Sequence, residues 1–381
     1  MWLRSNYCPA NEQCDATSES ETSSTAFQVD QSETIRIDTA QSIRTMKYAD
    51  GSEVKCQPAR DTVFLGQTST SSQDICLTTH VVDTSPLDAD GIIGLAPPAG
   101  ISSTINSTFA AAKLETASTS FFHTLNSLFH QMKVSFWYDV DSTYSASRII
   151  PSFGQATIGG ADASKYKGDM VWLPIINESK LWILPLSGYG VHPSTPCDFP
   201  SCDSFVTPET PIQAFMDTGT TMIVVPSRIY RFMQRFFTPT ANTSSTFFID
   251  CNSTHNMPSI SFQIGTTLLT LMPSQLFVKV TPTLCLSVFQ KSGTSDEESD
   301  AASVVFGSLF LRNFYTTFDG ANRLIGVAVP IEKHSALISS ISSTSNPSSK
   351  TTPANGSSNS KLDFMSLLQC LLLHLFMLDL L

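Results

Sequence analysis

An all-β fold is predicted from the composition of the sequence and from the way its apolar runs are interrupted. Ser, Thr, Pro, Gly and aromatic residues are plentiful, and short apolar runs are separated by turn-forming residues, as in short strands joined by tight connections. The 381 residues are enough for two lobes of ordinary domain size.

Only 14% of the residues are charged, with a formal net charge of -11. Such an acidic surface, poor in Lys and Arg, argues against nucleic acid as a partner.

Nine cysteines and several Asn-x-Ser/Thr sequons indicate an oxidising secretory route, although chance creates some sequons. No Cys-x-x-Cys pair or His cluster at metal spacing accompanies the cysteines, so disulfides are favoured over a metal site. Spacing alone does not choose among the possible pairings. The sequons begin at Asn106, Asn177, Asn242, Asn252 and Asn355.

The first residues lack the charged and apolar regions of a signal peptide. Residues 1–5 lead directly into Cys-containing sequence, and the polar stretch up to about residue 30 is expected on the surface. Because a secreted, disulfide-bonded protein needs a targeting signal, we expect further sequence upstream of Met1.

In the first half, residues 34–37 and 43–46 alternate apolar and polar side chains, which predicts half-buried strands. Helices are predicted over 104–114 and 121–131. Residues 134–138 return to strand composition.

The second half is organised around residues 214–221, where an apolar strand runs into an Asp-Thr-Gly turn. Gly219 permits the sharp turn, and the flanking strands would hold the Asp217 carboxylate in a fixed orientation. The chain then leaves as a second apolar strand. Further along the chain, the pattern predicts a helix over 227–236 and strands over 259–262 and 268–272.

The segment Asp217-Thr218-Gly219-Thr220 resembles the C-terminal catalytic motif of the pepsin-like aspartic endopeptidases, the peptidase A1 family. One such tripeptide often occurs by chance, but other matches follow in the family's order over roughly residues 1–330. They are residues 47–52, 90–96, 158–162 with Tyr166 and Gly168, 306–308, 310–312, 318–319 and 325–328.

The resemblance implies a bilobal, all-β, pepsin-like fold with a central cleft, whose first N-terminal strands are missing from this chain. Residues 1–163 would form the incomplete N-terminal lobe with a flap. Residues 164–330 would form the C-terminal lobe with the Asp-Thr-Gly motif. Residues 331–381 would be a Ser/Thr-rich stalk and an apolar tail.

Each motif residue acquires an expected role from the resemblance. Asp217 would be one of two catalytic carboxylates, and Gly219 would form the turn. Thr218 would hydrogen-bond across the pair, Thr220 would orient Asp217, and Thr221 would help to bind substrate.

A β-hairpin flap closes over the substrate in this family. Tyr48 would pack its ring beside the scissile bond, and Gly51 would leave room for the peptide at the flap tip. Ala49 and Asp50 depart from the usual flap pattern. The alternative for Tyr48 is an ordinary surface tyrosine at the end of a strand.

The resemblance also suggests three disulfide pairings, and two of the remaining cysteines would then pair across a hairpin beyond the flap. The expected pairs are Cys8 with Cys14, Cys197 with Cys202, Cys251 with Cys285, and the remaining Cys56 with Cys76.

Peptide hydrolysis by this route requires two carboxylates that share a proton. Like charges at that distance cannot both ionise, so the ionised carboxylate activates a water while its protonated partner protonates the carbonyl oxygen. No metal, other cofactor or covalent intermediate is required.

The first of these carboxylates is not found in the chain. The apolar pair and Gly at residues 92–94 recur at 305–307, but the spacing from Gly307 back to Asp217 leads from Gly94 to Arg4. Trp2 and Ser5 resemble the strand that follows the family's first Asp-Thr-Gly-Ser, so we expect that Asp shortly upstream of Met1.

Two tempting substitutes are rejected. In Asp38-Thr39-Ala40, Ala replaces the Gly that frees the turn, and Asp15 has no apolar strand before it.

We therefore expect a monomeric aspartic-type endopeptidase acting on polypeptides, with the chain as written inactive for want of its first Asp. The alternative is a non-catalytic protease homologue that binds peptides or a protein partner. The sequence encoded immediately upstream of Met1 would discriminate between them.

The C-terminal residues suggest surface attachment. Residues 335–360 are rich in Ser and Thr, as in a disordered, O-glycosylated stalk, and residues 364–381 are mostly apolar. A membrane helix there would be short, interrupted by polar residues and without a basic flank. The small residues at 355–357, a spacer and the apolar end resemble a GPI-attachment signal. We expect an extracellular, lysosome-like or cell-surface location, with membrane contact only through this tail; a helix or a chance tail are the alternatives.

Overall fold

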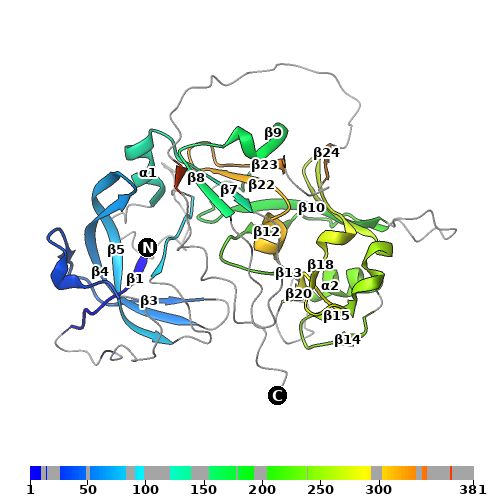
Figure 1. Cartoon of the computed structure of the whole chain (residues 1–381), viewed down its shortest axis with the longest axis horizontal. Helices are drawn as coiled ribbons and strands as arrows, with labels where there is room; N and C mark the ends of the chain where they lie inside the picture. The colour runs from blue at the N-terminus through cyan, green and yellow to red at the C-terminus, as the bar shows by residue number, and fades with distance from the viewer. Residues whose placement is uncertain are drawn as a thin grey trace. The chain divides into compact units, whose positions relative to one another are not determined.

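The structure is a computed structural model in which most elements are β-strands (Figure 1), so the all-β fold class is confirmed. Contacts divide the chain into two compact units, here called unit 1 (Met1–Lys133) and unit 2 (Val134–Asp363). This division, between Lys133 and Val134, is closer to the N-terminus than the lobe boundary predicted near residue 163. The structure describes residues 1–9, 14, 26–48, 52–82, 91–97, 121–138, 154–176, 179–192, 204–237, 239–292, 303–331, 337–340 and 361–362.

Unit 1 is built on one sheet, whose strand order is β2-β4-β5-β1-β6, with β3 paired to β4. A long hairpin, β4–β5, forms its centre, and β1 runs parallel to β5 and antiparallel to β6. The strands are β1 (Trp2–Arg4), β2 (Arg36–Ile37), β3 (Arg44–Lys47), β4 (Glu53–Leu65), β5 (Thr68–Val82) and β6 (Gly91–Ile92).

The core of unit 1 is small and lies on both faces of this hairpin. Val54, Cys56 and Cys76 pack on one face, and Ala59, Ile75 and Leu77 form a second cluster. The helix α1 (Phe121–Phe129) buries Phe121, Phe122 and Leu125, and its Thr124 hydroxyl donates to the side chain of Gln73 on β5. The predicted helix over 104–114 lies outside the described residues.

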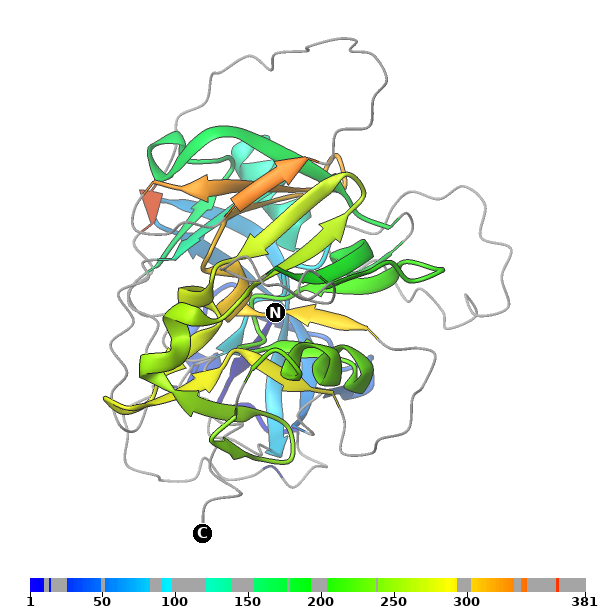
Figure 2. The same ribbon diagram turned by 90° about the vertical axis from the view of Figure 1, so that its right-hand side faces the viewer.

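Unit 2 contains three sheets in its described part. The largest has the order β20-β13-β21-β12-β10-β16-β17-β24, with β11 on β10; the others have the orders β14-β15-β19-β18 and β25-β8-β7-β22-β23-β9. The adjacent strands β22 and β23 are orange in Figures 1 and 2.

The strands of unit 2 begin with β7 (Lys133–Tyr138), whose first residue closes unit 1, and continue with β8 (Gly154–Ile158), β9 (Tyr166–Pro174), β10 (Ile183–His192), β11 (Ser204–Val206), β12 (Ile212–Met216), β13 (Ile223–Val225), β14 (Ala241–Asn242), β15 (Phe247–Asp250), β16 (Ser259–Ile264), β17 (Thr267–Leu271), β18 (Phe277–Lys279), β19 (Leu284–Ser287), β20 (Phe289–Lys291), β21 (Val304–Phe306), β22 (Tyr315–Asp319), β23 (Leu324–Pro330), β24 (Leu337–Ser340) and β25 (Lys361–Leu362). Its α-helices are α2 (Ser227–Gln234) and α3 (Ser308–Leu311).

Aromatic side chains fill the core of unit 2. Phe306 stacks on Phe310 with ring centroids 4.0 Å apart, and Phe262 contacts both rings edge-on. The helix α2 follows Pro226 and is amphipathic: Ile229 and other apolar side chains are buried while its arginines face solvent. Phe306 of this aromatic cluster lies on β21, the strand that pairs with β12 and β13 on either side of the Asp217 turn.

Three of the expected disulfides are present in the structure. Cys8–Cys14 closes a short N-terminal loop, Cys56–Cys76 joins β4 to β5, and Cys251–Cys285 joins the end of β15 to β19. The expected pair Cys197–Cys202 lies outside the described residues.

Candidate active site

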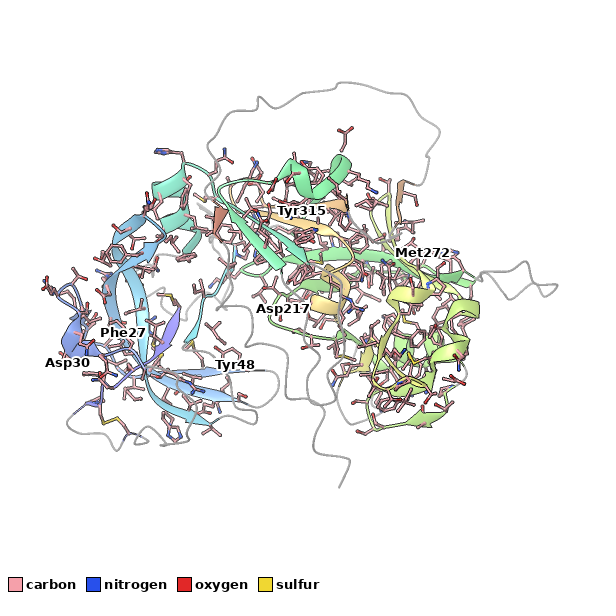
Figure 3. All side chains as sticks on the ribbon, viewed as in Figure 1. Phe27, Asp30, Tyr48, Asp217, Met272 and Tyr315 are labelled. Atoms are coloured by element: carbon pink, nitrogen blue, oxygen red, sulfur yellow. A yellow bond between two sulfur atoms is a disulfide. The ribbon has the colours of Figure 1, made fainter. Side chains whose placement is uncertain are left out.

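The Asp217 turn is held between strands that are distant in sequence. The strand β21 lies between β12, to which it is parallel, and β13, to which it is antiparallel. Phe306 is paired with Met216 on one side and with Ile223 on the other. The register therefore places Asp217 directly after β12 (Figure 3). The strands before and after its turn, β12 and β13, both pair with β21.

The Asp217 carboxylate is oriented by its own turn. The Gly219 N–H donates to Oδ1 at 2.9 Å, and the Thr220 hydroxyl donates to Oδ2 at 2.6 Å. The Asp217 N–H donates to the Phe306 carbonyl at 3.1 Å. Because Asp217 is exposed and each carboxylate oxygen has further acceptor capacity, the group can still bind a water or a proton donor.

Gly307 is required because the backbone of residues 220–222, at the end of the Asp217 turn, approaches it closely. An added Cβ would lie 2.5 Å from the Thr220 carbonyl oxygen and 2.4 Å from that of Met222. The Gly307 N–H donates to the Met222 carbonyl, and the Ser308 N–H donates to the Thr220 carbonyl at 2.7 Å. Together these contacts pin residues 220–222 to the start of α3.

An aromatic layer backs the strand that carries Asp217. The Met216 N–H donates to the Trp182 carbonyl at 2.9 Å, and the Trp182 ring contacts Phe318 edge-on. Phe318 contacts Phe136 on β7 in the same way. Tyr138, two residues further on the same strand, is buried; burial raises its pKa, and the Asp217 charge raises it further. Asp217, which is exposed, thus follows a strand that is hydrogen-bonded to the backbone of this aromatic cluster.

The sequence model of the family described as "Eukaryotic aspartyl protease" matches residues 1–329. This chain belongs to that family. The family assignment made from the motifs is thereby confirmed.

Curated relatives include pregnancy-associated glycoprotein 2 from Bos taurus, which is 27% identical over 272 residues, or 70% of this chain and 62% of the relative. Chymosin from Ovis aries is 30% identical over 175 residues, covering 46% of this chain and 41% of the relative. Pepsin A-5 from Mus musculus is 29% identical over 171 residues, covering 45% and 41%. The chain thus spans less than two thirds of the length of each of these relatives.

In unit 1, a hairpin contains described residues that were expected to belong to the flap. The strands β3 and β4 pair from Arg44↔Cys56 to Lys47↔Glu53, and the Tyr48 N–H donates to the Ser52 carbonyl at 2.9 Å. Tyr48 is 37% exposed. The expected flap glycine, Gly51, lies outside the described residues, and the substrate-binding roles of Tyr48 and Thr221 stay predictions, as does the role of Thr218.

Asp38 serves a local turn. Its carboxylate accepts from the Ala40 N–H at 3.2 Å and from the Gln41 side-chain amide at 2.6 Å, just after β2. Asp15 lies outside the described residues. In the described part of the chain, no group of three or more His, Cys, Asp or Glu residues could hold a metal ion.

Sequence reasoning identified the aspartyl protease turn but missed the aromatic layer behind it. The signal was available for β7, because Val134, Phe136 and Tyr138 alternate with other residues and are all buried on one face. No comparable signal linked Trp182 to Met216, since their contact is a backbone hydrogen bond.

Proposed function

We propose that this chain belongs to an aspartic-type endopeptidase in which Asp217 acts with a second carboxylate supplied upstream of Met1. Polypeptides are its substrates, and it works as a monomer without metal or other cofactor. Asp217 and its partner share a proton, so that one activates a bound water and the other protonates the peptide carbonyl.

A repeated strand arrangement is the observation that carries this proposal. In unit 2, β13 is antiparallel to β21 and parallel to β20. In unit 1, β1 is antiparallel to β6 and parallel to β5 in the same way. The other neighbour of β21 is β12, which ends at Asp217, whereas β6 has only β1 beside it among the described strands. A counterpart of β12, with its own Asp-Thr-Gly turn, would fit that outer edge of β6.

The two equivalent glycines support the same proposal. Gly307 is enclosed by the backbone of the Asp217 turn, but an added Cβ on Gly94 would meet nothing within 4 Å among the described residues. Glycine at residue 94 is understandable if an upstream turn lies against it, as residues 220–222 lie against Gly307.

The proposal is tested with an upstream-extended protein assayed on peptides with apolar residues around the scissile bond, at acidic pH. We expect cleavage that a statyl-type peptide inhibitor blocks. Asp217→Asn should lower kcat/KM by a factor of about 10⁴ or more, at or beyond the upper end for loss of a general acid or base, while leaving the fold intact. Residues 1–381 alone should show no useful activity.

Asp38→Asn is the matched control, since Asp38 also precedes a Thr but serves a local turn. It should leave cleavage unchanged. Activity of residues 1–381 that is indifferent to Asp217→Asn would contradict the two-carboxylate mechanism.

A non-catalytic homologue that binds peptides is the second candidate, and it is favoured by the single Asp-Thr-Gly among the 381 residues. Sequence upstream of Met1 that encodes no Asp-Thr-Gly, together with inhibitor binding without cleavage, would support this candidate instead.

The disulfides support a secretory route to an extracellular, lysosome-like or cell-surface location. We propose GPI attachment through the C-terminal tail, which lies outside the described residues. Within the described residues, no helix has the length and apolarity to cross a membrane. Release of the full-length, cell-expressed protein by phosphatidylinositol-specific phospholipase is expected; retention after treatment would argue for a membrane helix.

A further inference from the structure

The flap-like hairpin meets the rest of unit 1 at a β-bulge. Between β4 and β5, Lys55 is paired with His80 but Cys56 is paired with Thr78, so Thr79 is an extra residue on β5. Its hydroxyl donates to the Lys55 carbonyl at 3.3 Å. A bulge interrupts the ladder of hydrogen bonds and bends the strand that carries it. This bulge therefore marks a mechanical boundary in the sheet.

We define the outer hairpin as residues 45–47 of β3 with residues 53–55 of β4 and 80–82 of β5, all on the flap side of this bulge. Among the described strands, β3 pairs only with β4. The outer hairpin is consequently an edge structure with few lateral hydrogen bonds, and such segments open at low free-energy cost.

The disulfide Cys56–Cys76 lies on the other side of the boundary. Cys56 is the first residue of β4 beyond the bulge, and it is fully buried while Cys76 is 9% exposed. Val54 packs with both cysteines, and Met46 and Val81 of the outer hairpin pack against this cluster. The apolar underside of the outer hairpin therefore rests on the disulfide.

Cys76 also connects the disulfide to β1. Cys76 is paired with Trp2, and its N–H donates to the Met1 carbonyl at 2.9 Å. Two residues later, the Thr78 hydroxyl donates to the Leu3 carbonyl at 3.0 Å. The disulfide thus joins the root of the flap-like hairpin to the strand next to β1.

We propose that Cys56–Cys76 is a positioning element that fixes the flap root to β1 and confines flap opening to the outer hairpin, with Thr79 as the hinge. The cross-link prevents β4 and β5 from separating at residues 56–58, because it removes the open states that such separation would populate. Opening then stops at the bulge. The hinge stands on unit 1 alone, whereas the hairpin's role as a substrate flap rests on the proposed function.

The test is native hydrogen exchange of residues 1–381, read by mass spectrometry after a reducing quench. In the unmodified protein, the amides of the outer hairpin should exchange faster than those of residues 56–57 and 76–78. In the double variant Cys56→Ala, Cys76→Ala, the amides of residues 56–57 and 76–78 should exchange about tenfold faster or more, so that the opening segment extends beyond the bulge. Cys56→Val with Cys76→Ala is a second variant that fills the buried space if the first does not fold.

Two further variants separate this role from general stabilisation. Loss of the Cys8–Cys14 disulfide, in the same unit, should leave the boundary at the bulge. Deletion of Thr79 restores a regular ladder and should slow exchange of the outer hairpin. Uniform acceleration across unit 1 in both disulfide variants, or a boundary that stays at Lys55 without Cys56–Cys76, would overturn the proposal.

Because exchange is measured without substrate, the outcome does not depend on peptidase activity. If the upstream-extended protein is active, loss of Cys56–Cys76 should raise KM more than it lowers kcat. Failure of the exchange test would overturn the hinge, whereas an inactive extended protein with the expected exchange would overturn only the proposed function.

Discussion

Gly94 in unit 1 and Gly307 in unit 2 follow equivalent apolar pairs, yet only Gly307 is enclosed. The backbone of residues 220–222 leaves no room for a Cβ on Gly307, while a Cβ on Gly94 would meet none of the described residues within 4 Å. Neither glycine has a positive φ, so conformational freedom does not explain either one. The difference teaches that a glycine can be required by a neighbouring segment. The turn that packs against Gly307 leaves no space for any side chain at that position.

The largest predicted effect is at Gly307. Gly307→Ala forces the Asp217 turn away from α3, because the contacts below 3 Å are with carbonyl oxygens and the carbonyl carbon of Thr221, all backbone atoms that cannot rotate aside. We expect a loss of about 3 kcal/mol or more in the free energy of unfolding of unit 2. Urea denaturation measures it.

Gly94→Ala is the matched variant. In residues 1–381 it should change the free energy of unfolding by less than about 0.5 kcal/mol. In the upstream-extended protein it should become strongly destabilising. Equal, small costs in both proteins would mean that no turn packs on Gly94.

A second prediction concerns the edge of β6. An extension that adds a strand there would satisfy the backbone groups of β6 that no described strand pairs with, so the extended protein should resist limited proteolysis longer. In residues 1–381, the first cuts should fall before about residue 163, since unit 1 has small core clusters whereas unit 2 has an extensive aromatic core. Mass spectrometry of the fragments locates the cuts, and a more resistant N-terminal half would contradict this expectation.

The smallest predicted effect is alkaline sensitivity of unit 2. Burial raises the pKa of Tyr230 to about 12 and also raises that of Tyr138. The folded state therefore holds these protons more tightly than the unfolded state. Their contribution to the free energy of unfolding is fully present below the unfolded-state pKa near 10. It is lost as pH rises from about 10 to 12.

Tyr230→Phe should make the fall in unit 2 melting temperature over that pH range less steep. Circular dichroism at a series of pH values measures the slope. Tyr48→Phe, at an exposed ring of unit 1, is the control and should leave it unchanged; an unaltered slope in Tyr230→Phe would contradict the burial argument.

Much of the fold was predictable from the sequence where periodicity was strong. The helix predicted over 227–236 is α2, Ser227–Gln234, and the strand predicted over 259–262 lies within β16, Ser259–Ile264. The turn at Asp217 was also recognisable, because its glycine and flanking apolar strands are local signals. The repeated apolar pair and Gly predicted a correspondence between the two halves that the strand register now supports.

The differences have local physical causes. The helix predicted over 121–131 ends at Phe129, because His130 adopts φ 56°, a left-handed conformation that stops a helix. The strand predicted over 34–37 is reduced to Arg36–Ile37, because the hydroxyls of Ser32 and Thr34 donate to the buried Asp61 carboxylate. Such side-chain bonds compete with regular strand pairing and leave little periodic signal.

The strand β24 has a practical consequence for making this protein. It lies just beyond the family-matched region and pairs with β17 from Thr267↔Ser340 to Thr270↔Leu337. A recombinant domain that stops at Pro330 would uncover the edge of β17, whose row of free N–H and C=O groups is a template for another chain. Such a product should aggregate during refolding. A domain for crystallisation or biophysical work is better ended after Ser340, where the short strand β24 replaces β17 as the edge of the described sheet.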